Sequence, residues 1–230
     1  MSARPSRVLA VALLVAAVVA GIAAWWSLRG DSASGAPAPA NAPMVVDPAS
    51  VDAANEGRLV QVHGLLDADG VAVDPDLGIS SGAVLMLREV EMYQWVERCI
   101  AVACVHEAEW SEALVDSSAF QTGSTHANPA SMPFASGRFA AASPRVGAFL
   151  IDAELLAALP SVPRPVSVSE LAPNLAAIFR DVDGALFSGD DPAKPVVGDL
   201  RVRYHIIAGG EVTLSGVQRG DRLVPAPSQP

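Results

Sequence analysis

The chain has 230 residues, of which 51% are hydrophobic and 17% charged, and its formal net charge is −10. This length allows one domain of ordinary size with a tail or an anchor. The first 30 residues hold three arginines and no acid, so the rest of the chain carries 12 basic against 25 acidic residues. Such a surface repels a phosphate backbone, which argues against a nucleic-acid partner.

The segment Val8–Leu28 contains no charged residue. As a helix it would be about 31 Å long, which is enough to cross the core of a bilayer. Arg4 and Arg7 precede it, so residues 1–7 are expected in the cytoplasm, and the tryptophans at 25–26 fall where an interfacial aromatic belt would lie. We therefore predict one transmembrane helix that contacts the lipid bilayer through residues 8–28.

A cleaved signal peptide is the rival interpretation, because it has the same basic start and apolar run. The apolar run exceeds a usual signal-peptide core, and the sequence Trp-Trp-Ser is a poor continuation for cleavage. These features favour an uncleaved signal-anchor and a single-pass membrane protein. In either case the main domain is exported, to the periplasm or outer surface in a bacterium and to a lumen in a eukaryote.

Residues 29–46 are rich in Pro, Ala and Ser, which is the composition of a semi-rigid linker, and a folded domain is expected over residues 47–230. The domain opens with a predicted strand, Arg58–Leu66, and a turn at Asp67–Gly70. Two alternating segments, Leu85–Arg98 and Ala103–Trp110, then predict the strands of one hairpin.

The next segments are shorter and more irregular. A short helix or turn is expected at Ser111–Phe120, a loop over 125–137, a strand broken by Pro144 at Arg138–Ile151, and a short helix at Asp152–Pro160. Alternation over Val197–Ile207, followed by Gly209-Gly210 and EVTLSGVQ, predicts a second hairpin. These elements indicate an α+β domain dominated by antiparallel strands, with short helices.

Cys99 and Cys104 are separated by the four residues IAVA. The alternatives are a structural disulfide, two free buried thiols, and a redox or metal site. The C-x4-C spacing is not the C-x-x-C of thiol–disulfide oxidoreductases, and a zinc site would need His106 and one more ligand, which the sequence does not supply nearby. Export favours oxidation, and opposed strand positions meet disulfide geometry. We predict a disulfide that staples the turn.

This pairing would fix the register of the hairpin. With Cys99 opposite Cys104, Tyr93 lies opposite Trp110, and Trp95 and Trp110 become diagonal neighbours on one face. We expect that face to be the core side of the sheet.

The stretch GISSG, Gly78–Gly82, fits the pattern of a nucleophile elbow, which would make Ser80 a hydrolase nucleophile. The elbow needs a strand before the serine and a helix after it, whereas a turn-like DPDL precedes this serine and a strand follows. We read the stretch as a loop that enters a strand and predict no catalytic residue. An exported hydrolase that uses Ser80 is kept as the alternative.

Two acidic stretches, DADG at Asp67–Gly70 and DVDG at Asp181–Gly184, hint at calcium loops. Neither continues with the glycine and glutamate of an EF-hand, and Asp and Gly are also ordinary turn residues. The four histidines, at positions 63, 106, 126 and 205, show no ligand spacing. We therefore predict no metal and no cofactor.

Several blocks together resemble a known family. They are NEGRLVQVHG, REVEMYQWVE, EWSEALVDSSAF, HANPASMPF and VGDLRVRY, in this order between Asn55 and Tyr204. The chain is similar here to the LUMA family, also called the transmembrane protein 43 family, and its composition suggests a bacterial member.

The resemblance implies a membrane protein with a role in membrane organisation, as animal members are multi-pass proteins of the endoplasmic reticulum and inner nuclear membrane linked to lamins and emerin. It supplies no catalytic residue. Family members usually continue into further membrane helices, whereas this chain ends in LVPAPSQP. We expect a binding or membrane-organising module rather than an enzyme, with unidentified protein partners; a truncated family member without its full function is a further alternative.

Overall fold

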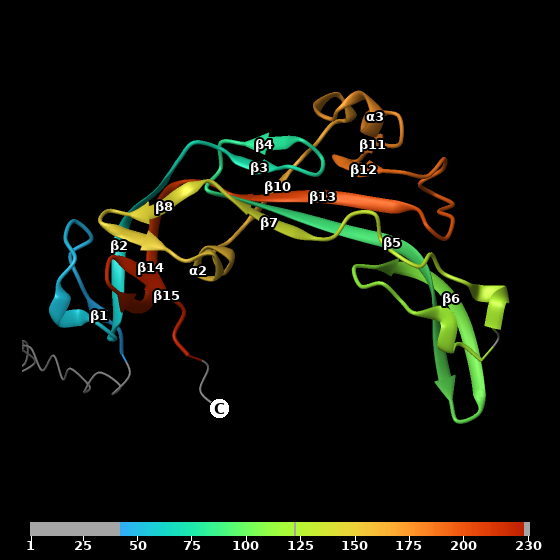
Figure 1. The fold of residues 1–230 in the computed structure, drawn as a ribbon, viewed down its shortest axis with the longest axis horizontal. Coiled ribbons are helices and arrows are strands. Elements are labelled where there is room, and N and C mark those ends of the chain that lie inside the picture. The colour runs from blue at the N-terminus through green and yellow to red at the C-terminus, as the bar shows by residue number, and fades with distance from the viewer. Residues whose placement is uncertain (1–41, 122, 228–230) are drawn as a thin grey trace, which may run out of the picture. The chain divides into compact units, whose positions relative to one another are not determined.

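The computed structural model describes residues 42–121 and 123–227, and most of the regular structure in these ranges is β-strand (Figure 1). The predicted predominance of antiparallel strands with a few short helices is confirmed for this part, but the described residues form a mostly β domain rather than an α+β one. The predicted transmembrane helix at residues 8–28 lies outside the described residues. No helix of the described ranges is both long enough and apolar enough to span a membrane.

The first sheet has six strands and contains both ends of the described domain. β2 pairs with β14 and also with β8, so strands β2, β14, β15, β9 and β8 close into a ring, with β1 parallel to β2 outside it. β1 lies within the stretch predicted to be linker. The strands are β1 (Met44–Val45), β2 (Leu59–Asp69), β8 (Ala142–Val146), β9 (Phe149–Ile151), β14 (Gly210–Arg219) and β15 (Arg222–Val224).

The second sheet has seven strands around two long ones, β5 and β13. β5 pairs with all of β13 along one edge, and along its other edge with β7 and then β6. β13 also pairs with β10 and β12. The strands are β5 (Leu85–Ile100), β6 (Ala103–Ser111), β7 (Gly137–Ala140), β10 (Val162–Arg164), β11 (Arg180–Val182), β12 (Ala185–Phe187) and β13 (Leu200–Ile207).

The remaining elements are short. β3 (Ala72–Asp74) and β4 (Ile79–Ser81) form a separate hairpin. The helices are η1 (Ala53–Asn55), η2 (Ser117–Ala119), η3 (Gly123–His126), α2 (Ala153–Ala157), η4 (Val168–Glu170) and α3 (Pro173–Ala176). The helix predicted at Asp152–Pro160 is confirmed as α2, and the Asp152 side chain caps it by accepting from the backbone N–H of Glu154.

The buried apolar side chains form two clusters. The first core contains Met86, Val90 and Met92 of β5 with residues of β3, β4, β12 and β13, and the second core is formed by the five strands that close into a ring, with Val84, Leu85, Leu156 and Ile207. Neighbouring side chains on a strand point to opposite faces, so Leu85 of the same strand packs into the second core. β5 therefore links the two cores.

Three local predictions are wrong. β13 and β14 do not form a hairpin, because β13 pairs with β5 while β14 crosses to the other sheet and pairs with β2. The turn predicted at Asp67–Gly70 is strand as far as Asp69, where β2 meets β8 through an irregular register. The strand predicted at 138–151 is three strands, with Pro144 inside β8.

Candidate functional site

The hairpin of β5 and β6 continues past the point where β13 ends. β13 leaves β5 at Met92, whereas β6 accompanies β5 to Ile100 (Figure 1). The predicted register is confirmed, with Tyr93 opposite Trp110 and Cys99 opposite Cys104. The two sulfurs are joined in a disulfide with a Cα–Cα distance of 4.0 Å. We call residues 98–105 the hairpin end.

The turn at the hairpin end has two residues, Ala101 and Val102, between the paired Ile100 and Ala103. Ala101 has a φ of 55°, a left-handed conformation that two-residue hairpins usually give to glycine. An alanine in this conformation costs about 1–2 kcal/mol. The disulfide next to the turn holds the two strands together, although the turn residues themselves do not favour a tight turn.

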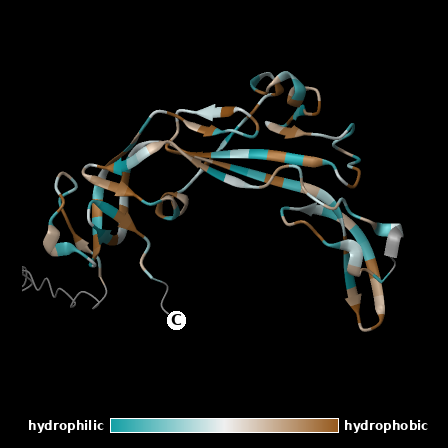
Figure 2. Cartoon of the chain, in the orientation of Figure 1, coloured by the Kyte–Doolittle hydropathy of each residue, from teal (hydrophilic) through white to brown (hydrophobic). Residues whose placement is uncertain are grey.

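The hairpin end exposes apolar side chains. Ile100 is 86% exposed and Val102 is 91% exposed, and Val105 on the next strand is 58% exposed. Figure 2 shows hydrophobic residues at this free end of the green hairpin of Figure 1. From the sequence these residues were expected only as turn residues between the cysteines, and not as an exposed apolar surface. The signal was present, because four apolar residues in an exposed turn are unusual.

Behind the hairpin end, one face of the hairpin carries a polar pair. Glu97 lies opposite His106, and Glu97 Oε1 is 2.8 Å from His106 Nε2. Their side chains are 13% and 6% exposed. The backbone N–H of Gln121 also donates to Glu97 Oε1 at 2.7 Å, and the His126 ring stacks on His106 with centroids 4.4 Å apart. His106 was a candidate ligand from the sequence, whereas its contact with Glu97 was not predicted.

The segment after β6 is held on the hairpin by two side-chain amides. Asn128 accepts from the backbone N–H of Trp95 and donates to the Trp95 carbonyl, at 2.7 and 2.9 Å, so it occupies the place of a neighbouring strand. Gln94, which is fully buried, bonds the backbone of Ala113 and Val115 in the same way. These contacts fix the segment that covers Glu97 and His106.

The expectation that Trp95 and Trp110 face the core is wrong. On the part of β5 next to Trp95 the buried residues are Met92 and Gln94, so the core lies on the face opposite to Trp95. Both tryptophans are partly buried. Trp95 meets the His126 ring edge-on at 4.4 Å, and Trp110 packs against Tyr93, Phe187 and the Arg201 guanidinium.

A second polar cluster is buried in the first core. Arg88 binds both oxygens of Asp74 and also binds Asp76, and the Tyr204 hydroxyl donates to Asp74. Asp74 is fully buried, and Arg88 and Tyr204 are almost so. The Arg88 Nε donates to the Ala135 carbonyl at 2.8 Å. The cluster joins the β3–β4 hairpin to the second sheet.

Burial shifts the pKa of Tyr204 far above its usual value, and the hydrogen bond to Asp74 adds to the shift. Burial lowers the pKa of Arg88, but the hydrogen bond to Asp76 and the charge of Asp74 outweigh it and raise the pKa overall. Both groups are therefore fixed in their protonated forms at neutral pH. The cluster therefore suits a structural role better than a role in proton transfer, because proton transfer needs a group with a pKa near the working pH.

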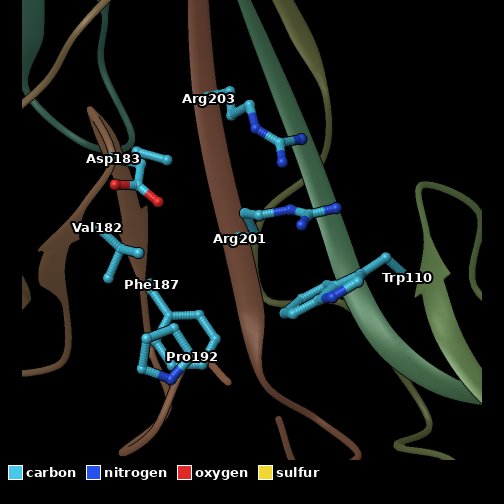
Figure 3. A pocket seen from close by; sticks show the side chains of 8 residues that line it. Trp110, Val182, Asp183, Phe187, Pro192, Arg201 and Arg203 are labelled. Carbon is cyan, nitrogen blue, oxygen red and sulfur yellow. The ribbon is translucent and has the colours of Figure 1, made fainter. Parts of the chain in front are cut away.

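A small pocket lies between β6, β12 and β13 (Figure 3). Its volume is about 200 Å³, below the roughly 300–1,000 Å³ of most ligand pockets. Arg201 and Arg203 both bind Glu91, at 2.7 Å each, and Asp183 lies on the opposite wall. Because acids already accompany both arginines, the pocket does not offer a free positive charge to an anion.

Ser80 lies in the middle of strand β4, opposite Val73 of β3. Its side chain is exposed, and its backbone carbonyl accepts from Arg164 Nη2 at 3.0 Å. A nucleophile elbow places the serine on a turn between a strand and a helix. The local structure around Ser80 therefore differs from the elbow, although the serine is in a strand rather than in the predicted loop.

The other candidate residues are dispersed. His63 contacts Thr213 on the first sheet, whereas His205 lies near Glu89 on the second. Asp67 and Asp69 are in β2, so DADG is not a loop. DVDG contains the tight turn between β11 and β12, with φ of 50° at Asp183 and 77° at Gly184, as expected of an Asp-Gly hairpin turn.

Comparisons with known proteins give one consistent result. The sequence model of the family described as "Transmembrane protein 43" matches residues 92–230. Transmembrane protein 43 of Rattus norvegicus and that of Homo sapiens are each 30% identical to this chain over 207 residues, which is 79% of this chain and 51% of the relative.

A more distant relative, the transmembrane protein 43 homolog of Drosophila melanogaster, is 29% identical over 187 residues, or 74% of this chain and 49% of the relative. The chain thus spans about half the length of the curated relatives it matches. No solved structure matches the chain significantly.

Proposed function

Because the chain belongs to the transmembrane protein 43 family and is a membrane protein, we propose that it is a membrane-anchored extracytoplasmic binding module whose hairpin end inserts into the lipid bilayer. The single observation that carries this proposal is the exposure of Ile100 and Val102 on a stapled two-residue turn. Apolar side chains that are exposed next to one another mark sites of contact with a membrane or a protein.

Burial of the apolar side chains in the bilayer supplies the driving force for insertion of the hairpin end. Full burial of one Val or Ile side chain contributes about 1.5–3 kcal/mol. Two or three such residues are too few for stable anchoring alone. A chain that is already tied to the membrane has a high effective concentration near the bilayer, so weak contacts of this kind become significant. The disulfide adds rigidity, which lowers the entropic cost of insertion.

Charges next to the hairpin end favour a neutral lipid over an anionic one. Arg98 binds Glu107 and Glu109 across the strands, at 3.2 and 2.6 Å. The two acids outnumber the single base, and the domain as a whole is acidic. A negatively charged leaflet would repel this surface, so contact with a zwitterionic bilayer is proposed.

A site-specific photocross-linker tests the contact. Benzoylphenylalanine is placed at Val102 in the full chain, reconstituted into phosphatidylcholine vesicles, with Val162 on β10 (54% exposed) as the matched control. Lipid adducts at position 102, with few at 162, are expected. Equal lipid adducts at both positions, or adducts at 102 only to a second copy of the chain, would contradict the proposal.

The binding role is proposed in place of catalysis. The position of Ser80 within strand β4 supports this choice, since it lacks the strand–turn–helix setting of an elbow. A serine-reactive phosphonate probe should leave the full chain unlabelled. Labelling that is lost in Ser80→Ala would favour the hydrolase instead.

A further inference from the structure

One face behind the turn carries four potential metal ligands, of which three lie close to one another and the fourth, His106, contacts Glu97. Glu97 and Cys99 alternate on β5, and Cys104 and His106 alternate on β6, so all four side chains project from one face as two directly opposed pairs. A carboxylate oxygen of Glu97 and the two sulfurs lie within 4.8 Å of one another. Cys99 Sγ is 3.4 Å from Glu97 Oε2, and His106 Nε2 is 2.8 Å from Glu97 Oε1.

We propose that, when the Cys99–Cys104 disulfide is reduced, these two cysteines bind Zn²⁺ together with Glu97 and His106. Two thiolates, one imidazole and one carboxylate are all ordinary zinc ligands. Donor atoms in a tetrahedral zinc site are separated by about 3.3–3.8 Å, given bond lengths of about 2.0–2.3 Å. The 3.4 Å between Cys99 Sγ and Glu97 Oε2 already falls in this range, and reduction frees the two sulfurs to move apart to it.

The surroundings also suit a metal site. His106 and Glu97 are largely buried, while Cys99 is exposed and gives access to the ion and to a reductant when the hairpin end is not in the bilayer. Gln121 donates its backbone N–H to Glu97, which fixes the orientation of that carboxylate as partners of ligands do in zinc sites. The imidazole of His106 is positioned by stacking on the His126 ring.

The chemistry requires a dithiol reductant. Thiol–disulfide exchange breaks the Cys99–Cys104 bond, converts the reductant to its disulfide, and leaves two protein thiols. Zinc then binds the two thiolates and displaces their two protons to solvent. In the oxidised protein the sulfurs are bonded to each other and cannot serve as thiolate ligands, so the disulfide and the zinc site exclude one another.

Metal titration of the full chain in detergent tests the inference. After reduction and removal of the reductant, Zn²⁺ alone should bind one ion per chain, and Co²⁺ should give the absorption of a tetrahedral thiolate complex. The oxidised chain should bind neither ion at this site. Glu97→Gln should weaken zinc binding at least about ten-fold, because even outer partners of a site contribute that much.

The controls separate the site from adventitious binding. His63→Ala, on a distant exposed histidine of the first sheet, should bind zinc like the unaltered chain. The Cys99→Ser/Cys104→Ser variant, checked for native circular dichroism, should lose the ion. Zinc binding that persists in that variant, equal binding before and after reduction, or binding unaffected by both Glu97→Gln and His106→Gln would overturn the four-ligand site.

Discussion

Arg88 binds both carboxylate oxygens of Asp74 inside the first core, with Nη1 2.8 Å from Oδ1 and 2.7 Å from Oδ2. Because Asp74 is fully buried, removal of the arginine would leave a carboxylate without its counter-charge. We expect Arg88→Met to lower the free energy of unfolding by about 3–5 kcal/mol. Denaturation of the full chain in detergent, followed by circular dichroism, measures this loss.

The matched control is Arg98→Met, which removes an exposed arginine on the same strand and should leave the thermal midpoint unchanged. The double variant Asp74→Leu/Arg88→Met should be more stable than Arg88→Met alone, because no buried charge is left unpaired. A double variant as unstable as the sum of both single variants would show that the pair is not coupled.

Tyr204 predicts a specific pH dependence. Its pKa is raised in the folded state, mainly by burial, so its contribution to stability is present below the unfolded pKa of about 10 and is lost as pH rises above it. Tyr204→Phe should cost about 1–3 kcal/mol at pH 8, because Asp74 loses a buried donor. The difference between the two proteins should shrink between pH 10 and pH 11; a constant difference in urea melts would refute the assignment.

The staple at the hairpin end should be present in protein extracted under acid quench. Cys99 and Cys104 should resist alkylation, and a peptide that contains both should be two hydrogens lighter than its reduced form. Closure of so short a loop stabilises the folded chain by about 2 kcal/mol on the loop-entropy account. Two alkylated cysteines in the unreduced protein would contradict the disulfide.

The orientation of the chain rests on Arg4 and Arg7 before the uncharged segment Val8–Leu28. A reporter that is active only outside the cytoplasm, fused after Pro230, should be active. Reversal of the charges by Arg4→Glu/Arg7→Glu should reduce that activity. Activity of a cytoplasm-only reporter at the same position would mean that the domain faces the other way.

The register of the main hairpin was predictable because two cysteines five residues apart can face each other in only one simple way. The buried face was not, since β5 carries apolar residues on both sides: Met92 on one, Tyr93 and Trp95 on the other. The first core packs against the side that carries Met92. The segment anchored by Asn128 partly covers the other side. Alternation of apolar and polar residues identifies a strand, but when both faces carry apolar residues it does not show which face is buried.

The strands that pair with β13 and β14 could not be predicted from the sequence either. A double glycine between two alternating segments predicts a hairpin, but here the chain passes from one sheet to the other at this point. The contact of Asp74 with Arg88 and Tyr204 likewise depends on how β3 packs against the second sheet. Nothing in the spacing of these residues indicates that they meet.

Contact of the hairpin end with the bilayer can be measured by lipid-borne quenching of a tryptophan introduced by Val102→Trp. Val102→Trp and the control Val162→Trp are compared in vesicles of brominated and ordinary phosphatidylcholine, with the fluorescence of the four native tryptophans subtracted. We expect brominated lipid to quench the fluorescence added at position 102, and aqueous acrylamide to quench the fluorescence added at position 162. Strong acrylamide quenching at 102 with no effect of brominated lipid would mean that the hairpin end does not enter the bilayer.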